Sequence, residues 1–116
     1  MSSSELCKLV VEGMKEKKAQ DIVTMDLRAV ENAIADYFVI CSGKSDTQID
    51  AICNSIEESV YKNTNINPWH LEGKQNKEWI LLDYIDVVAH VFRTDRREYY
   101  AIEDLWADAQ SIFVEN

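Results

Sequence analysis

Gly43-Lys44-Ser45 is the first stretch of this chain whose residue types could do chemistry, because it looks like the end of a phosphate-binding P-loop. The full motif needs a glycine five positions before Gly43, where this chain has Phe38. A loop with so few glycines cannot wrap a triphosphate with backbone N–H groups. We therefore interpret these residues as a tight turn that leads into a capped helix.

Asp83 and Asp86 suggest a second chemistry, nucleotidyl transfer, in which a Gly-Ser turn grips the nucleotide and paired aspartates hold two metal ions. The two aspartates lie three positions apart across a predicted turn. They cannot both point into one site, as an alternate-residue pair on a strand would. The sequence therefore favours a degenerate relative of that fold over a working one. A nucleotidyltransferase-like enzyme or a nucleotide-binding protein remains the alternative function.

The cysteines and histidines predict no metal site and no catalytic nucleophile, since Cys41, Cys53, His70 and His90 lack the spacing of either. The three cysteines are odd in number and lie among apolar residues, so we expect buried thiols in a reducing compartment. We interpret His90, which has apolar neighbours, as a sheet histidine that a neighbour hydrogen-bonds. We predict a protein without catalytic residues, metal or cofactor.

Charge argues against nucleic acid as the main partner. The net charge is −9, and residues 1–58 carry eleven acids and six bases while residues 59–116 carry ten and six. Nucleic-acid binding depends on neutralising phosphates, which needs a basic stripe that this chain lacks. We expect a protein partner and little direct nucleic-acid contact.

Length and hydropathy limit the number of domains and the cellular location. The 116 residues suit a single domain, residues 1–116. No apolar run reaches the length of a membrane span, and the first residues resemble neither a signal peptide nor a transit sequence. We expect no membrane contact and a bacterial cytoplasmic location.

The elements that must position these residues follow from periodicity and capping. Capping boxes at Ser2, Ser45 and Asp95 predict three helices, the second ending near Asn63 and the third running to the end of the chain. Branched and apolar runs predict strands at 22–27, 37–41, 69–71, 78–83 and 87–92, of which 37–41 is central and the last two form a hairpin. Residues 28–35 give no clear pattern. We predict an α/β (mixed α+β) fold with a mixed sheet of about five strands flanked by helices.

Residues 79–108 interleave aromatic and charged side chains. Tryptophan, tyrosine and arginine dominate binding hot spots, so this region predicts a protein interface. The competing interpretation is that half or more of the aromatics fill the core beneath the last helix. An exposed aromatic hairpin could also pair with itself, which predicts a possible homodimer of the free protein.

Three segments resemble the ribosomal silencing factors, also called the Iojap or RsfS family. They are Ala35-Asp36-Tyr37-Phe38-Val39-Ile40-Cys41-Ser42-Gly43, Glu72-Gly73 with Trp79-Ile80-Leu81-Leu82-Asp83-Tyr84, and His90-Val91-Phe92 with residues 97–109. The resemblance implies a truncated nucleotidyltransferase-like fold without catalytic activity. It also implies binding to large-subunit ribosomal protein fourteen, which blocks joining of the small subunit and lowers translation when nutrients are scarce.

The matched positions imply a contact surface for that partner. Its residues are Trp79, Leu82, Asp83, Tyr84, His90, Phe92, Arg97, Tyr100 and Trp106. Ile85 departs from the family pattern, which usually has glycine at this position. A branched residue disfavours a positive φ, so we expect the hairpin turn to differ there.

Overall fold

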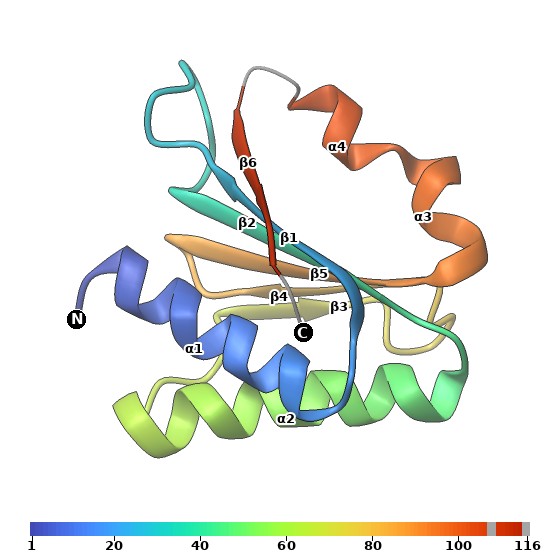
Figure 1. Cartoon of the computed structure of the whole chain (residues 1–116). Coiled ribbons are helices and arrows are strands. Elements are labelled where there is room, and N and C mark those ends of the chain that lie inside the picture. Colours follow the sequence, from blue (N-terminus) through green and yellow to red (C-terminus); the bar gives the residue numbers. More distant parts are fainter. Residues whose placement is uncertain (107–108, 115–116) are drawn as a thin grey trace.

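The computed structural model describes residues 1–106 and 109–114. Its elements, in chain order, are α1 (Ser3–Glu16), β1 (Gln20–Asp26), β2 (Tyr37–Gly43), α2 (Asp46–Thr64), β3 (His70–Glu72), β4 (Trp79–Asp83), β5 (Val87–Arg93), α3 (Thr94–Tyr100), α4 (Ile102–Leu105) and β6 (Gln110–Phe113). Helices α1 and α2 lie on one side of a sheet, and α3 and α4 lie on the other (Figure 1). The predicted mixed fold is confirmed.

The sheet has six strands in the order β3-β4-β5-β2-β1-β6. Strands β2 and β5 are parallel, and every other neighbouring pair is antiparallel. All seven residues of β2 are buried, which confirms the central strand expected from its unbroken apolar run. The predicted hairpin is also confirmed, since Trp79 pairs with Phe92 and Asp83 with Val88.

In two of the three predicted capping boxes the N-cap serine caps its helix as expected. The Ser2 hydroxyl accepts from Glu5 N at 3.1 Å, and the Ser45 hydroxyl accepts from Gln48 N at 3.1 Å. Helix α2 ends at Thr64 rather than at Asn63, because Asn65 adopts the left-handed conformation that closes it. The third box was wrong: α3 begins at Thr94 without a side-chain cap, and the Asp95 carboxylate pairs with Arg93 instead.

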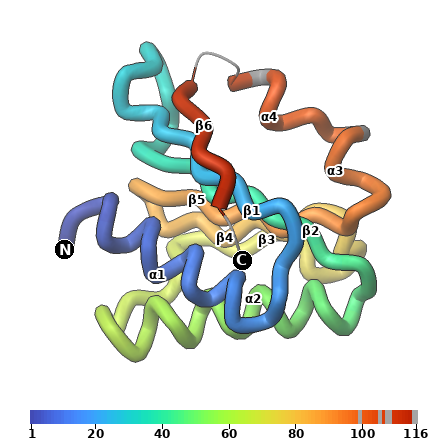
Figure 2. Tube along the Cα trace, viewed as in Figure 1, coloured from blue at the N-terminus to red at the C-terminus, as the bar shows by residue number. Residues whose placement is uncertain are grey.

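The prediction of one helix from Asp95 to the end of the chain was wrong. Ala101 has φ 48° and separates α3 from α4, and β6 then pairs with the free edge of β1. Figure 2 shows β6 running beside β1. Pairing satisfies the backbone groups along that edge of β1, so the count of about five strands becomes six. Residues 107, 108, 115 and 116 of the expected helix lie outside the described part of the chain.

Each face of the sheet carries its own core. One face, which we call the helix-covered face because the two long helices lie on it, packs against α1 and α2 through a cluster that includes Val39, Ile52 and Leu82. The opposite face, which we call the aromatic face, includes Phe38, Phe92 and Ile102. The cysteines are free and buried as predicted, and burial raises the pKa of Cys7 to about 11 and that of Cys53 to about 12. These thiols are therefore protonated and unreactive near neutral pH.

Candidate protein-contact surface

The aromatic face gathers six rings from three strands and the segment after β5. This aromatic cluster consists of Phe38, Trp79, His90, Phe92, Tyr100 and Trp106. Trp79 stacks on Phe92 with ring centroids 5.2 Å apart and lies 5.0 Å from Tyr100. The hairpin register explains this arrangement, because Trp79, His90 and Phe92 all point to one side of the pleated sheet.

His90 is held by Trp79. The Trp79 indole Nε1–H donates to His90 Nδ1 at 3.0 Å, so neutral His90 carries its proton on Nε2. Burial lowers the pKa of His90 to about 3. His90 is therefore uncharged near neutral pH, and the predicted sheet histidine with a hydrogen-bonding neighbour is confirmed.

Arg97 ties the aromatic face to the end of the sheet. Its guanidinium donates to the Asp21 carbonyl at 2.6 Å and to the Ser42 hydroxyl at 3.0 Å. The same group binds both Glu103 carboxylate oxygens, at 2.9 and 3.3 Å. Since Glu103 lies in α4, one side chain joins α3, α4, β1 and β2 and thereby fixes the elements that carry Tyr100 and Trp106.

The nine sequence-predicted contact residues fall into two groups. Four are buried, namely Leu82 and Phe92 at 0% exposure, His90 at 2% and Tyr84 at 6%. Leu82 and Tyr84 belong to the helix-covered face, whereas His90 and Phe92 lie within the aromatic cluster. The other five are partly exposed: Trp79, Asp83, Arg97, Tyr100 and Trp106. This second group has surface available to a partner in the observed conformation.

The hairpin turn takes the conformation that its sequence disfavours. Ile85 has φ 75°, and Asp86 N donates across it to the Tyr84 carbonyl at 3.0 Å, closing a three-residue γ-turn. The Asp83 carboxylate accepts from Ile85 N at 2.7 Å and holds the turn from the other side. The expectation that a branched residue would avoid a positive φ was wrong, because these hydrogen bonds impose the turn.

Sequence reasoning missed several exposed apolar side chains. Trp69 is 75% exposed beside the edge strand β3, and Ile34 is 75% exposed in the segment between β1 and β2. The available signal for Ile34 was its position within residues 31–36, a turn segment whose sequence has neither strand nor helix periodicity. The segment forms turns beside the β4–β5 hairpin, where its side chains line a pocket with Ile85.

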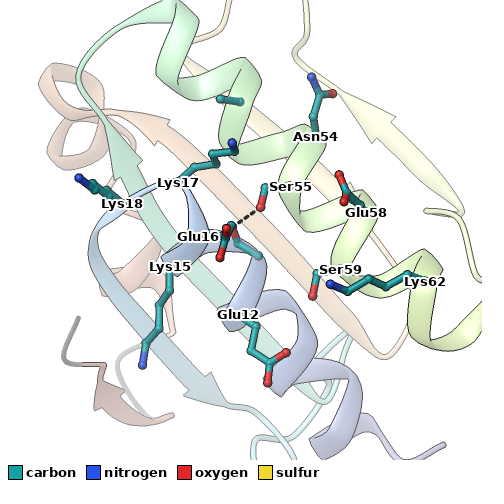
Figure 3. Close-up of a pocket in the computed structure, with 12 residues that line it drawn as sticks. Glu12, Lys15, Glu16, Lys17, Lys18, Asn54, Ser55, Glu58, Ser59 and Lys62 are labelled. Carbon is teal, nitrogen blue, oxygen red and sulfur yellow. Dashed lines mark hydrogen bonds between the residues drawn. The ribbon is translucent and has the colours of Figure 1, made fainter.

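A larger open groove follows the outer side of α1 and α2 (Figure 3). Its walls mix charges of both signs, including Glu12, Glu16, Glu58, Lys15 and Lys62. The floor is the crossing of the two helices, where the Ser55 hydroxyl donates to the Gly13 carbonyl at 2.7 Å. We interpret this groove as a solvated helix surface.

The turn at Gly43 uses its backbone donors within the chain. Lys44 N donates to the Gln48 side-chain oxygen at 2.8 Å, and Gln48 N donates to the Ser45 hydroxyl. The described ranges 1–106 and 109–114 contain no group of three or more candidate metal ligands. Those ranges also contain no helix with the length and apolar character needed to cross a bilayer.

Comparison with known proteins gives a consistent result. Residues 1–116 match the family model described as ribosomal silencing factor during starvation. The ribosomal silencing factor RsfS of Halalkalibacterium halodurans is 39% identical over 115 residues, which cover 99% of this chain and 97% of that protein. A crystal structure of a Chromobacterium violaceum protein has a TM-score of 0.85 at 30% identity, covering 100% of this chain and 95% of that one.

A more distant relative has a name that refers to the large subunit. Mitochondrial assembly of ribosomal large subunit protein 1 from Mus musculus is 30% identical over 101 residues. The match covers 84% of this chain and 43% of that longer protein.

Proposed function

This chain belongs to the ribosomal silencing factor family, and on that premise we propose that it binds the large ribosomal subunit and represses translation. The proposed contact is ribosomal protein fourteen, on the face where the small subunit docks. Occupying that face blocks subunit joining by steric exclusion and lowers translation under nutrient limitation. The observation that carries the proposal is the family match over the whole chain.

Charge supports a protein partner. The net charge of −9 attracts a basic ribosomal protein and repels exposed RNA phosphates. Such attraction speeds encounter and weakens as salt rises. We propose that the protein acts in the bacterial cytoplasm with little direct contact to RNA.

We propose that the partner touches the partly exposed members of the predicted contact surface, Trp79, Asp83, Arg97, Tyr100 and Trp106. The buried members pack behind that surface, His90 and Phe92 within the aromatic cluster and Leu82 and Tyr84 on the other face of the sheet. Trp79 illustrates the division, because its hydrogen bond to His90 and its stacking on Phe92 fix the indole before any partner arrives. Such preorganisation reduces the entropy lost on binding.

Co-sedimentation with separated large and small subunits tests the proposal. We expect wild-type protein to sediment with large subunits only, and Trp106→Ala to weaken that binding. Tyr61→Ala is the matched control, because Tyr61 is a 48% exposed aromatic on α2, across the sheet from Trp106. Tyr84→Ala is unsuitable, since Tyr84 is buried and its loss would disturb the core.

The proposal would be refuted if wild-type protein failed to sediment with large subunits at every salt concentration tested. The nucleotide-binding alternative is tested by calorimetric titration with nucleotide and divalent metal, in which we expect no heat at micromolar ligand. Self-association of the free protein stays a prediction, and light scattering tests it. Both edges of the β4–β5 hairpin are already paired, so self-pairing through strand edges would need β3 or β6.

A further inference from the structure

A shallow pocket lies where the β4–β5 turn meets the segment after β1. We call it the turn pocket, and its walls include Val30, Ile34, Asp36, Ile85 and Asp86. Its volume of about 240 Å³ is smaller than the roughly 300 Å³ at which small-molecule sites begin. The pocket therefore suits one inserted side chain better than a cofactor. None of the nine residues of the predicted contact surface lines it.

Backbone hydrogen bonds hold the two walls of the turn pocket together. The Asp86 carbonyl accepts from Asp36 N at 2.8 Å and from Tyr37 N at 3.1 Å. These bonds join the hairpin turn to the start of the central strand β2. The pocket is thus formed before any partner binds, which favours affinity.

Two exposed isoleucines line the turn pocket. Ile34 is 75% exposed and Ile85 is 60% exposed, although both are large apolar side chains. Ile85 also keeps φ 75°, a conformation that costs a β-branched residue free energy. An exposed apolar side chain held in a strained turn, as Ile85 is, is typical of a recognition surface rather than of a structural element.

Charge defines what the turn pocket can take. Arg28, which also lines it, donates to both carboxylate oxygens of Asp26 and lies over the Tyr37 ring, so its charge is already neutralised. Within the described residues, neither Asp36 nor Asp86 takes part in an ion pair shorter than 4.0 Å, and Arg28 attracts Asp36 only at longer range. Two exposed isoleucines beside two such carboxylates complement a long aliphatic side chain that ends in a cation.

We propose that the turn pocket receives a lysine or arginine side chain of the large-subunit protein that this chain binds. Ile34 and Ile85 pack on the aliphatic stem, and Asp36 and Asp86 pair with the cation. This inference rests on the proposed function and adds a second anchor beside the aromatic face. It gives a role in binding to Ile85, which lies outside the aromatic cluster.

The substitution Ile85→Gly separates a binding role from a structural one, because the two effects have opposite signs. Glycine relieves the positive φ, so the unfolding midpoint in urea should rise. Binding to large subunits should weaken roughly tenfold, because the apolar contact is lost. The matched control is Asn65→Gly, which replaces another residue of positive φ, at the C-terminal end of α2 and outside the pocket lining. It should leave binding unchanged.

Removal of one carboxylate charge tests whether the turn pocket binds a cation. Asp86→Asn should weaken binding roughly fivefold and reduce its salt dependence. Glu58→Gln makes the same charge change on the helix surface of Figure 3 and should have a much smaller effect. Wild-type affinity in both Ile85→Gly and Asp86→Asn would overturn the turn-pocket proposal alone. Absence of wild-type binding would instead overturn the proposed function, and the pocket's partner with it.

Discussion

Gly13→Ala offers the most direct test of how α1 and α2 pack. Glycine in a helix interior normally costs about 0.5–1 kcal/mol relative to alanine, so this change would ordinarily stabilise the protein. Here a Cβ at position 13 would lie 2.6 Å from Ile56 Cα and 2.9 Å from the Ser55 carbonyl oxygen. Both contacts are with backbone, which cannot rotate away as a side chain can.

The magnitude follows from the separation that the methyl group demands. Carbon atoms pack best at roughly 3.5–4.0 Å, so the helices must part locally by about 1 Å. The bonds from Ser55 Oγ to the Gly13 carbonyl and from Ser59 Oγ to the Leu9 carbonyl are both 2.7 Å long and would stretch past useful range. Overpacking costs about 1–3 kcal/mol, and each lost hydrogen bond costs about 1 kcal/mol. After the helix-propensity gain, we expect a net loss of about 2–4 kcal/mol.

Urea denaturation followed by circular dichroism measures this loss, and the melting temperature should fall by roughly 10 °C. The control is the pair Lys8→Ala and Lys8→Gly, at an exposed position of the same helix. Alanine should be the more stable of that pair by about 1 kcal/mol. If Gly13→Ala matched or exceeded wild-type stability while the Lys8 pair behaved normally, the close-contact argument would be wrong.

Four further predictions follow from single contacts. Because burial lowers the pKa of His90 to about 3 against about 6.5 in the unfolded chain, the unfolded state binds a proton that the folded state excludes between those pH values. Stability should therefore fall by up to about 1.4 kcal/mol per pH unit as pH drops below 6.5, and urea titrations from pH 7 to 5 should lose that slope in His90→Gln. Gly73→Ala places a Cβ 2.0 Å from the Trp79 carbonyl oxygen at φ 91°, so it should destabilise the β3–β4 connection by more than about 2 kcal/mol in the same assay. Arg97→Lys keeps the charge but loses the forked contact with Glu103, and thermal melts should show a loss of about 1–2 kcal/mol. Leu82→Ala should cost about 2–5 kcal/mol in urea, whereas Leu81→Ala should cost less because Leu81 is only partly buried.

Most of the fold could be predicted because local signals and burial agree. The capping serines Ser2 and Ser45 sit next to apolar stripes, and the unbroken run of β2 lies at the sheet centre. The end of the chain was harder, because Ile102 and Phe113 fit a helical period while Ala101 breaks the helix with a positive φ. Strand β6 exists because β1 offers a free edge, which is a tertiary fact that local periodicity does not contain.

The turn at Ile85 shows a second limit of sequence reasoning. Propensity predicts that isoleucine avoids a positive φ, yet Asp83, Tyr84 and Asp86 supply hydrogen bonds that outweigh the cost. The sequence did identify this position as unusual. It could not show that the side chain stays exposed beside Ile34, because residues 28–35 carry no periodic pattern.

Strand geometry explains why the predicted contact surface combines two layers. Successive side chains of β4 point to opposite faces, so Leu82 faces α1 and α2 while Trp79, Leu81 and Asp83 point toward the aromatic face. A matched run such as 79–84 contains both the surface and its support, and one position separates them. A substitution at Leu82 disturbs the core packing that supports the partner-binding residues, whichever they are. A loss of binding therefore assigns a contact only when the stability of the same variant is unchanged.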